Sequence, residues 1–262
     1  MLNYIKSELY RISHSKGIYI LCGVCEGLLL IMDLLLYAIW KDTPTFMYAN
    51  TAFVFNTACT FINAVLMLTI VMGCIVFGDE YKNRTLGNSI AFGGSPIKIY
   101  LGKVIVSLIV AFLALAVVLA IFIGSSYLLL QDSGIEILRG LLGTYLANSP
   151  ILIAGLLATI TFCFLFRSET AASWIWLIIF EGVPIVCLFL GMKFSFFAEL
   201  YHWLAVNVIG STHNIVGAEA VPDNVHWLWQ IPEGLCRTLL VGFLGILVFL
   251  VIGIAGMRRK EI

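Results

Sequence analysis

The stretch FGDEYKNRTLGNSIAFGGSPIKIYLGK, residues 77–103, is the longest polar interruption in the first two thirds of an otherwise apolar chain. It holds four cationic and two acidic side chains, namely Lys82, Arg84, Lys98, Lys103, Asp79 and Glu80. Hydrophobic runs of membrane-spanning length flank it on both sides, which is typical of a loop at a membrane surface. The rest of the chain can be divided into spans that surround this loop.

The composition of the whole chain indicates a membrane protein. Its 262 residues are 61% hydrophobic and 11% charged, with a mean hydropathy of +1.03, whereas a soluble domain has about 25% charged residues. The apolar runs are continuous over about 20 residues, the length of an α-helix that crosses a hydrocarbon core of about 30 Å. We therefore predict an all-α polytopic membrane protein with one transmembrane domain over residues 1–262.

Six hydrophobic runs define the predicted membrane spans. They cover residues 17–40, 49–77, 96–130, 141–166, 170–192 and 232–257. The loop over residues 78–95 has the pattern of a short helix that ends before Gly93. Ser95 and Pro96 then mark a helix start, with serine as N-cap and proline at the first helical position. Pro150 predicts a kink or break in the fourth span.

Two further segments are predicted to lie at the membrane surfaces. Residues 1–16 have an apolar stripe on one helix face, so we expect an interfacial helix whose lysines and Arg11 face lipid headgroups. Gly17 favours a bend between this helix and the first span. Residues 193–231 are rich in aromatic residues and histidine, which predicts short helices that lie in or dip into the outer leaflet.

The positions of the cations predict the orientation of the chain. Six spans put four of the fifteen Lys and Arg residues on one side, which are Lys41, Arg139, Lys193 and Arg237, and all others on the opposite side. The positive-inside rule then places both termini and the loop over residues 78–95 in the cytoplasm. Because the net charge is zero, composition gives no reason to expect a nucleic-acid partner.

The sequence contains no recognisable catalytic motif. It lacks the metalloprotease, serine-hydrolase and P-loop patterns, and His202, His213 and His226 are too widely spaced for a helical metal pair. The seven cysteines fall mostly within apolar runs, where they are typical of helix packing. We expect no enzyme activity, catalytic residue, metal site or cofactor in this chain, so active transport would need a partner or an ion gradient.

Three carboxylates, Glu26, Asp33 and Glu181, fall inside predicted spans. An ionisable group within a membrane is unfavourable unless it meets water or a partner. These residues are therefore candidates for a translocation path or a proton relay, and the alternative is that they hydrogen-bond a neighbouring helix. For Asp33 the packing alternative is favoured, because it lies nearer the outer interface.

The loop motif resembles that of a known transporter family. Glu80-Tyr81 with Thr85-Leu86, followed by Gly94-Ser95-Pro96, Lys98, Tyr100 and Lys103, is similar to the permease subunits of type-2 ABC exporters. The nearest likeness is to Gram-positive peptide exporters, namely lantibiotic-immunity, bacitracin-immunity and phenol-soluble-modulin permeases. The resemblance extends to the layout of the whole chain. Many of these permeases carry arginine at the position of Pro96.

The resemblance implies a bacterial plasma-membrane permease with two kinds of protein partner. A coupling helix over residues 79–92 would contact an ABC ATPase subunit, which would bind ATP and magnesium, through Asp79, Glu80, Tyr81, Arg84, Leu86 and Ile90. A second permease subunit, identical or different, would complete the complex within the lipid bilayer. The family implies export of amphipathic peptides or other hydrophobic compounds, and residues 193–231 would form re-entrant helices outside.

The residues alone leave other functions open. An ion-coupled secondary transporter would use Glu26, Asp33 and Glu181 as its proton relay and would respond to a pH gradient without ATP. A membrane-embedded enzyme is a third alternative, for which no set of nucleophile, base or metal ligands is evident in the sequence. The loop over residues 78–95 could equally be a solvated turn whose charges only follow the positive-inside rule.

Overall fold

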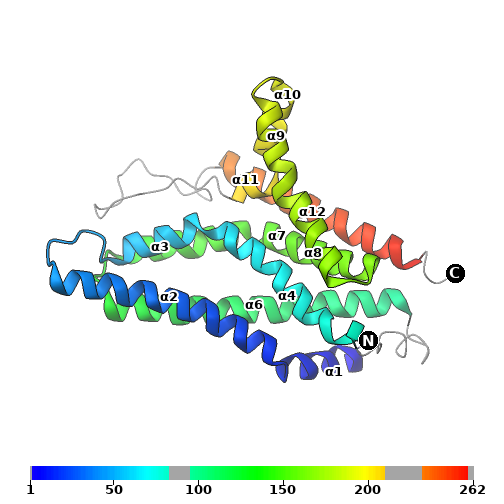
Figure 1. Ribbon diagram of the computed structural model, residues 1–262, viewed down its shortest axis with the longest axis horizontal. Helices are drawn as coiled ribbons and strands as arrows, with labels where there is room; N and C mark the ends of the chain where they lie inside the picture. The colour runs from blue at the N-terminus through cyan, green and yellow to red at the C-terminus, as the bar shows by residue number, and fades with distance from the viewer. Residues whose placement is uncertain (1, 83–94, 210–231, 259–262) are drawn as a thin grey trace.

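The computed structural model describes residues 2–82, 95–209 and 232–258, which are almost entirely helical (Figure 1). The elements are α1 Leu2–Ser13, α2 Lys16–Asp42, α3 Thr51–Thr60, α4 Ile62–Lys82, α6 Pro96–Leu129, α7 Ile135–Phe166, α8 Glu169–Leu177, the π-helix η1 Ile178–Gly182, α9 Val183–Gly191, α10 Ser195–Trp203, α11 Ala205–Ile209 and α12 Pro232–Arg258. Within the described residues the β pairing is confined to one isolated bridge, between Asn50 and Gln131. The predicted all-α class is therefore confirmed.

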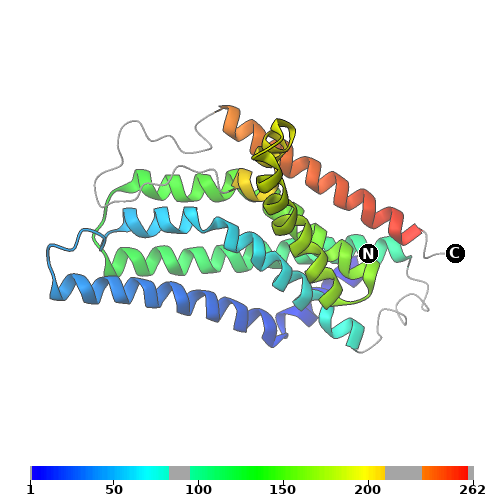
Figure 2. The ribbon, with the colours of Figure 1, turned by 45° about the horizontal axis from the view of Figure 1, so that its top comes forward.

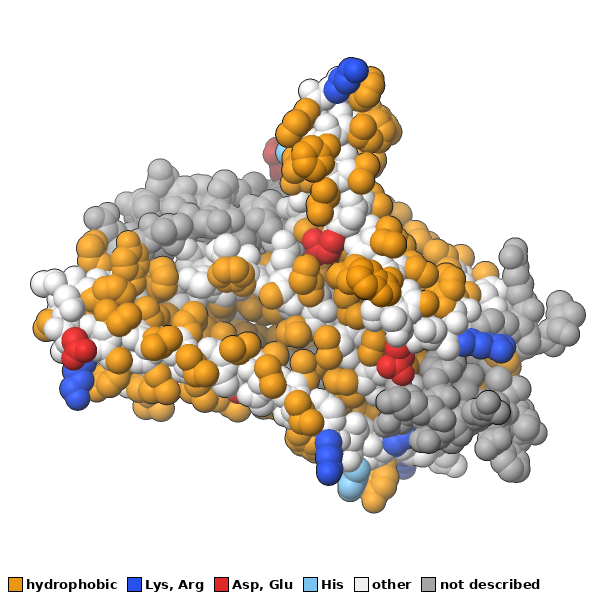
Figure 3. All heavy atoms as spheres, viewed as in Figure 1, with side chains coloured by type: hydrophobic (Ala, Val, Ile, Leu, Met, Phe, Trp, Pro, Cys, Tyr) orange, Lys and Arg blue, Asp and Glu red, His pale blue; other side chains and the backbone are white. Residues whose placement is uncertain are grey.

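Five helical segments are long and apolar enough to cross a membrane. They are α2, α6, α7, the continuous segment Glu169–Gly191 that joins α8 to α9, and α12. Helix α3 and residues 62–77 of α4 qualify together as a candidate span that is bent by 55° at their junction, so the number of spans is six if this pair is one span. On the face shown in Figure 3, hydrophobic side chains are spread along the described helices and charged ones are few, as expected for lipid-facing helices.

The junction between α3 and α4 at Phe61 was not expected from the sequence. It contains neither glycine nor proline, the usual causes of a helix break. Two threonine hydroxyls precede it, and they donate hydrogen bonds back into the helix, Thr57 to the carbonyl of Phe53 at 2.7 Å and Thr60 to that of Asn56 at 3.0 Å. Such bonds compete with backbone amides for the carbonyls and bend helices, which accounts for the break.

At Pro150, in contrast, a break was predicted and the helix continues. The expected kink or break would interrupt the fourth span, but α7 is assigned as one helix from Ile135 to Phe166, with Pro150 inside it. Proline cannot donate to the carbonyl four residues before it, which here belongs to Leu146. The hydroxyl of Ser149 donates to that carbonyl at 2.8 Å, so the acceptor is satisfied and the helix continues. Helix α7 also begins six residues before the predicted start at residue 141.

Helix α7 is the most buried of the long helices. It packs mainly against α12 and α4, and also against α8, α3, α6 and α11. In the most apolar 18-residue stretch of α7, 78% of the residues are buried. In the corresponding stretches of the other four long helices, 11–22% are buried. Glycines permit this close approach: a side chain at Gly242 of α12 would collide with Pro150 of α7. The core therefore lies along α7.

The two ends of the bundle differ in what they carry. At one end, which we call the loop end, lie α1, the C-terminal end of α4, the N-terminal end of α6, the turn from α7 to α8 and the C-terminal end of α12 (Figures 1 and 2). At the other end, Thr51 at the start of α3 is tied to the segment before α7: the Thr51 amide donates to the Gln131 carbonyl at 3.0 Å and its hydroxyl accepts from the Ser133 amide at 2.9 Å.

The two predicted surface segments are only partly described. Helix α1 ends at Ser13 and α2 begins at Lys16, with Ser15 as N-cap accepting from the Gly17 amide, so the two helices are separate and the boundary lies just before Gly17. Short helices α10 and α11 follow α9, and α9 and α10 form a hairpin that projects from the bundle (Figure 1). The rest of the predicted re-entrant segment, residues 210–231, lies outside the described residues.

Candidate functional site

The polar loop that opened the sequence analysis is described at its two ends. Helix α4 continues to Lys82, so the backbone of Asp79, Glu80 and Tyr81 is helical. Of the other predicted coupling residues, Arg84, Leu86 and Ile90 lie in residues 83–94, outside the described part. Helix α6 begins at Pro96 as predicted, and Ser95 occupies the N-cap position without a side-chain capping hydrogen bond.

A group of charged side chains joins α1 to both flanks of this loop. The ammonium of Lys103 on α6 donates to Oε2 of Glu8 on α1 at 2.9 Å, and Arg11 donates to the same oxygen at 3.0 Å. Arg11 also donates to the carbonyl of Val76 on α4 at 2.8 Å, and Lys103 donates to it at 3.4 Å. We call Glu8, Arg11, Lys103 and the Val76 carbonyl the flank cluster. It fixes three helices at the loop end.

The flank cluster is largely inaccessible to solvent. The side chain of Lys103 has no exposed surface and that of Glu8 is 8% exposed. The Lys103 ammonium also lies 5.0 Å from the ring centroid of Phe77, a favourable cation–π position. Burial alone would raise the pKa of the Glu8 carboxyl, but the charges of Lys103 and Arg11 outweigh it and hold this pKa below its ordinary value of 4.5. Glu8 is therefore the anion that both cations require.

The flank cluster corrects the prediction for the N-terminal helix. Arg11 was expected to face lipid headgroups, but it points to α4 and to Glu8. The sequence analysis also missed Glu8. A signal was present, because Glu8 lies three residues after Ile5 and four before Ile12, on the helix face that the apolar stripe shows to be buried. Ile12 is 1% exposed and Glu8 is 6% exposed, as that spacing requires.

Asp33 makes, through one of its two carboxyl oxygens, a hydrogen-bonded contact of the kind that the packing alternative predicts. Its side chain has no exposed surface, and its Oδ2 accepts hydrogen bonds from Ser125 at 2.6 Å and from Ser126 at 3.1 Å. Both serines are on α6, so the bonds join α2 to α6 within the apolar part of the bundle. A carboxylate that accepts such bonds is a helix-to-helix contact.

Glu26 is buried without such a contact. It lies two turns before Asp33 on α2, and 8% of its surface is exposed. Neither carboxyl oxygen has a hydrogen-bond partner among the described residues. A buried polar group of this kind is unfavourable by about 1–3 kcal/mol or more relative to a satisfied one. Of the three intramembrane acids, Glu26 is the one whose two carboxyl oxygens are both buried without a hydrogen-bond partner among the described residues.

Glu181 lies in η1, the single π-helical turn between α8 and α9. It is partly buried, and its Oε1 has no hydrogen-bond partner among the described residues. Turns of this kind are frequent at functional sites. Helix α2, which carries Glu26 and Asp33, packs on α6 and α4 rather than on η1. The described residues hold no group of three or more His, Cys, Asp or Glu side chains that could bind a metal ion, so the three acids form no shared cluster.

Comparisons with protein-family models, with curated proteins and with solved structures find no match. The role of the loop end is therefore inferred from its geometry and chemistry. These consist of a polar loop, a helix that extends into it, and a buried ionic contact that connects both flanks to the N-terminal helix.

Proposed function

We propose that the chain is the permease subunit of an ATP-driven ABC exporter, with the polar loop as its contact to a separate ATPase. The observation that carries this proposal is the flank cluster. A displacement of the loop reaches α4 and α6 directly, and Glu8 and Arg11 couple α1 to the same movement through charge-assisted hydrogen bonds. Flanks that are joined in this way would pass a push on the loop to three helices together.

The proposed contact surface begins on the last turn of α4. Asp79, Glu80 and Tyr81 belong to that turn, and Arg84, Leu86 and Ile90 would continue it. An amphipathic helix that presents Tyr81, Leu86 and Ile90 between charges suits a cleft on a soluble protein. The ATPase would bind ATP and magnesium, and the permease itself would have no catalytic role. A second permease subunit would complete the complex.

The proposed cycle uses ATP to change the orientation of the spans. Closure of the ATPase dimer would push the loop, and the movement would tilt α2, α3–α4 and α8–α9 and switch access from one side of the membrane to the other. The substrate would be an amphipathic peptide or another hydrophobic compound. It would shift the equilibrium between the two access states only by the difference in its affinity for them. The setting would be the bacterial plasma membrane, with both termini in the cytoplasm.

The first test is a pull-down of the detergent-solubilised chain from its native membrane, followed by mass spectrometry. A stoichiometric ABC ATPase is expected. In the reconstituted complex, Tyr81→Asp and Leu86→Asp should abolish stimulation of the ATPase by the permease, because each puts a charge into an apolar contact. Ile135→Asp is the matched control, since it adds the same charge at an exposed helix start at the other end of the bundle. Unchanged stimulation in both loop variants would refute the proposed contact.

Glu26 supports one alternative function, an ion-coupled secondary transporter. Its two carboxyl oxygens have no hydrogen-bond partner in the described part of the chain and are suited to bind and release a proton inside the membrane. Asp33 and Glu181 would be further members of the relay. In this case transport in proteoliposomes follows an imposed pH gradient, ignores ATP, and is lost in Glu26→Gln. Transport that requires the ATPase and persists in Glu26→Gln would exclude this alternative.

A further inference from the structure

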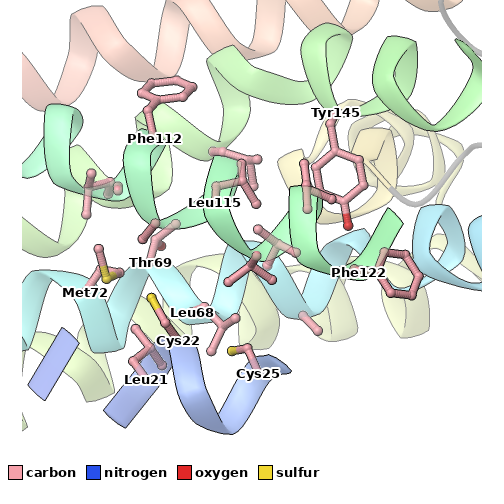
Figure 4. A pocket seen from close by; sticks show the side chains of 18 of the residues that line it. Leu21, Cys22, Cys25, Leu68, Thr69, Met72, Phe112, Leu115, Phe122 and Tyr145 are labelled. Carbon is pink, nitrogen blue, oxygen red and sulfur yellow. The ribbon is translucent and has the colours of Figure 1, made fainter. Parts of the chain in front are cut away.

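The bundle contains a side cavity of about 320 Å³, enclosed by α2, α4, α6 and α7 (Figure 4). Its walls are apolar except for a few polar groups that are already engaged. The hydroxyl of Thr69 donates to the Leu66 carbonyl at 2.6 Å, and that of Tyr145 donates to the Ala58 carbonyl at 3.5 Å. No Lys, Arg, Asp or Glu is among the residues that line it. The cavity is therefore suited to hydrocarbon rather than to a polar or charged ligand.

Small side chains and the helix break create this space. Ala64 on α4 and Ala111 and Ala114 on α6 leave room where larger residues would fill the gap. Phe61, at the 55° junction of α3 and α4, lies at the edge of the cavity. Because the chain changes direction there, α2 makes its main contact with α6 and a smaller one with α4. On this side the cavity is lined by Leu28 of α2 and by Phe61, and both side chains are well exposed.

The cavity opens onto the lipid-facing surface. Three residues that line it are also well exposed: Leu28 by 66%, Phe61 by 65% and Phe112 by 44%. Leu28 and Phe112 lie on α2 and α6, which are each long and apolar enough to span the membrane. Phe61 lies at the junction of the bent pair formed by α3 and α4. The medium outside the opening is thus the hydrocarbon of the bilayer. The inner wall, in contrast, is formed by Leu152 and Leu156 of α7, which are 8% and 2% exposed.

We propose that the side cavity binds one acyl chain of a bilayer phospholipid, which enters between α2 and α4 and reaches α7. We assign an acyl chain to this cavity because its surface is apolar all the way from the bilayer to the inner wall on α7. The size of the cavity excludes the amphipathic peptides of the proposed function, because a helix of about 10 Å diameter would place less than one turn in 320 Å³. The lipid site is therefore separate from any peptide path, and it does not depend on an ATPase partner.

Photolabelling of the purified full-length chain tests this inference. The chain is reconstituted in lipid nanodiscs with a phospholipid that carries a diazirine in one acyl chain, and the labelled residues are located by mass spectrometry after illumination. We expect labels on Leu152 or Leu156, which surrounding lipids cannot contact from outside the bundle. Labels on Phe243 and Leu244 of α12, which are 60% and 61% exposed, report the ordinary lipid-facing surface.

Two variants of α6 decide whether the label enters through the cavity. Ala114→Phe places a ring in the cavity and should remove the α7 label while the α12 label stays. Val117→Phe adds the same ring three residues away, at a position that is 51% exposed and does not line the cavity, and should leave both labels unchanged. If Ala114→Phe fails to fold, Ala114→Leu serves instead. The inference is overturned if the wild-type chain is labelled on α12 and not on α7, or if the α7 label survives in the filled variant.

Discussion

Lys103 and Glu8 form an ion pair of 2.9 Å in which the lysine is completely buried. They are 95 residues apart in sequence and join the N-terminal helix to the start of α6. A second pair, Arg139 with Glu136 at 2.6 Å, is 65% and 77% exposed at the other end of the bundle. The chain thus contains a buried ion pair between two helices and an exposed ion pair within one helix, and the effects of breaking each can be compared.

Removal of one partner of the buried pair should destabilise the protein strongly. Lys103→Met leaves Glu8 and Arg11 in a buried site without the central cation, and the expected loss is about 3–5 kcal/mol in the free energy of unfolding. Arg139→Met, at the exposed pair, should change it by about 1 kcal/mol or less. Unfolding in mixed detergent micelles, followed by tryptophan fluorescence, measures both. Equal losses in the two variants would mean that the flank cluster is not buried in the folded protein.

The stability that Glu8 contributes should depend on pH in a definite direction. Its pKa is held below 4.5 in the folded protein, so its ionised form is favoured by folding. This contribution is fully present above 4.5 and is lost as the pH falls through the lower folded pKa. The melting temperatures of the wild type and Glu8→Gln should therefore differ at neutral pH and converge in acid. A difference that widens on acidification would contradict the assignment.

The contact between Asp33 and α6 can be tested by removing its donors. In Ser125→Ala combined with Ser126→Ala, the buried carboxyl of Asp33 loses both described donors. The expected loss in unfolding free energy is about 1–3 kcal/mol. Ser13→Ala, an exposed serine bonded to the Tyr10 carbonyl at 2.9 Å, is the control, and its effect should stay within about 0.5 kcal/mol. An unaffected double variant would show that Asp33 has another partner in the membrane.

The close contact of α12 with α6 should tolerate no side chain at Gly253. A Cβ there would collide with the ring and hydroxyl of Tyr100, a buried residue that hydrogen-bonds Thr161 at 3.0 Å. Gly253→Ala should therefore cost about 1–3 kcal/mol by overpacking. Gly124→Ala, where a Cβ meets nothing within 4 Å, should be neutral or should stabilise the helix by up to about 1 kcal/mol. Thermal unfolding in detergent distinguishes the two.

The parts of the fold that could be predicted depend on local pattern. The long helices were predicted from apolar runs whose length matches the thickness of a bilayer. The start of α6 was predicted at the correct residue from Ser95 and Pro96. The break at Phe61 depends instead on the hydroxyl hydrogen bonds of Thr57 and Thr60, and the continuity of α7 at Pro150 depends on that of Ser149. Serine and threonine make several alternative bonds in helices, so their presence in a sequence does not determine the outcome.

The candidate site shows the same limit at longer range. Glu8, on the buried stripe of α1, could have been recognised as a buried acid, but its partner Lys103 is on a helix that the sequence does not place beside it. For the same reason Asp33 and Glu26 look alike in the sequence, seven residues apart on one helix face. Only the position of Ser125 and Ser126 on the neighbouring helix distinguishes Asp33, whose Oδ2 accepts two hydrogen bonds, from Glu26, neither of whose carboxyl oxygens has a partner among the described residues.

The central position of α7 has a consequence for biosynthesis. Helix α7 packs against helices that are made at different times. Helices α3 and α4 are translated before it, and α8, α11 and α12 are translated after it. While α12 is still in the ribosome, the surface of α7 around Pro150 faces lipid instead of Gly242. The native packing of the nascent chain is completed only when this late span inserts. A chain truncated before residue 232 would expose that surface permanently and become a substrate for membrane quality-control proteases.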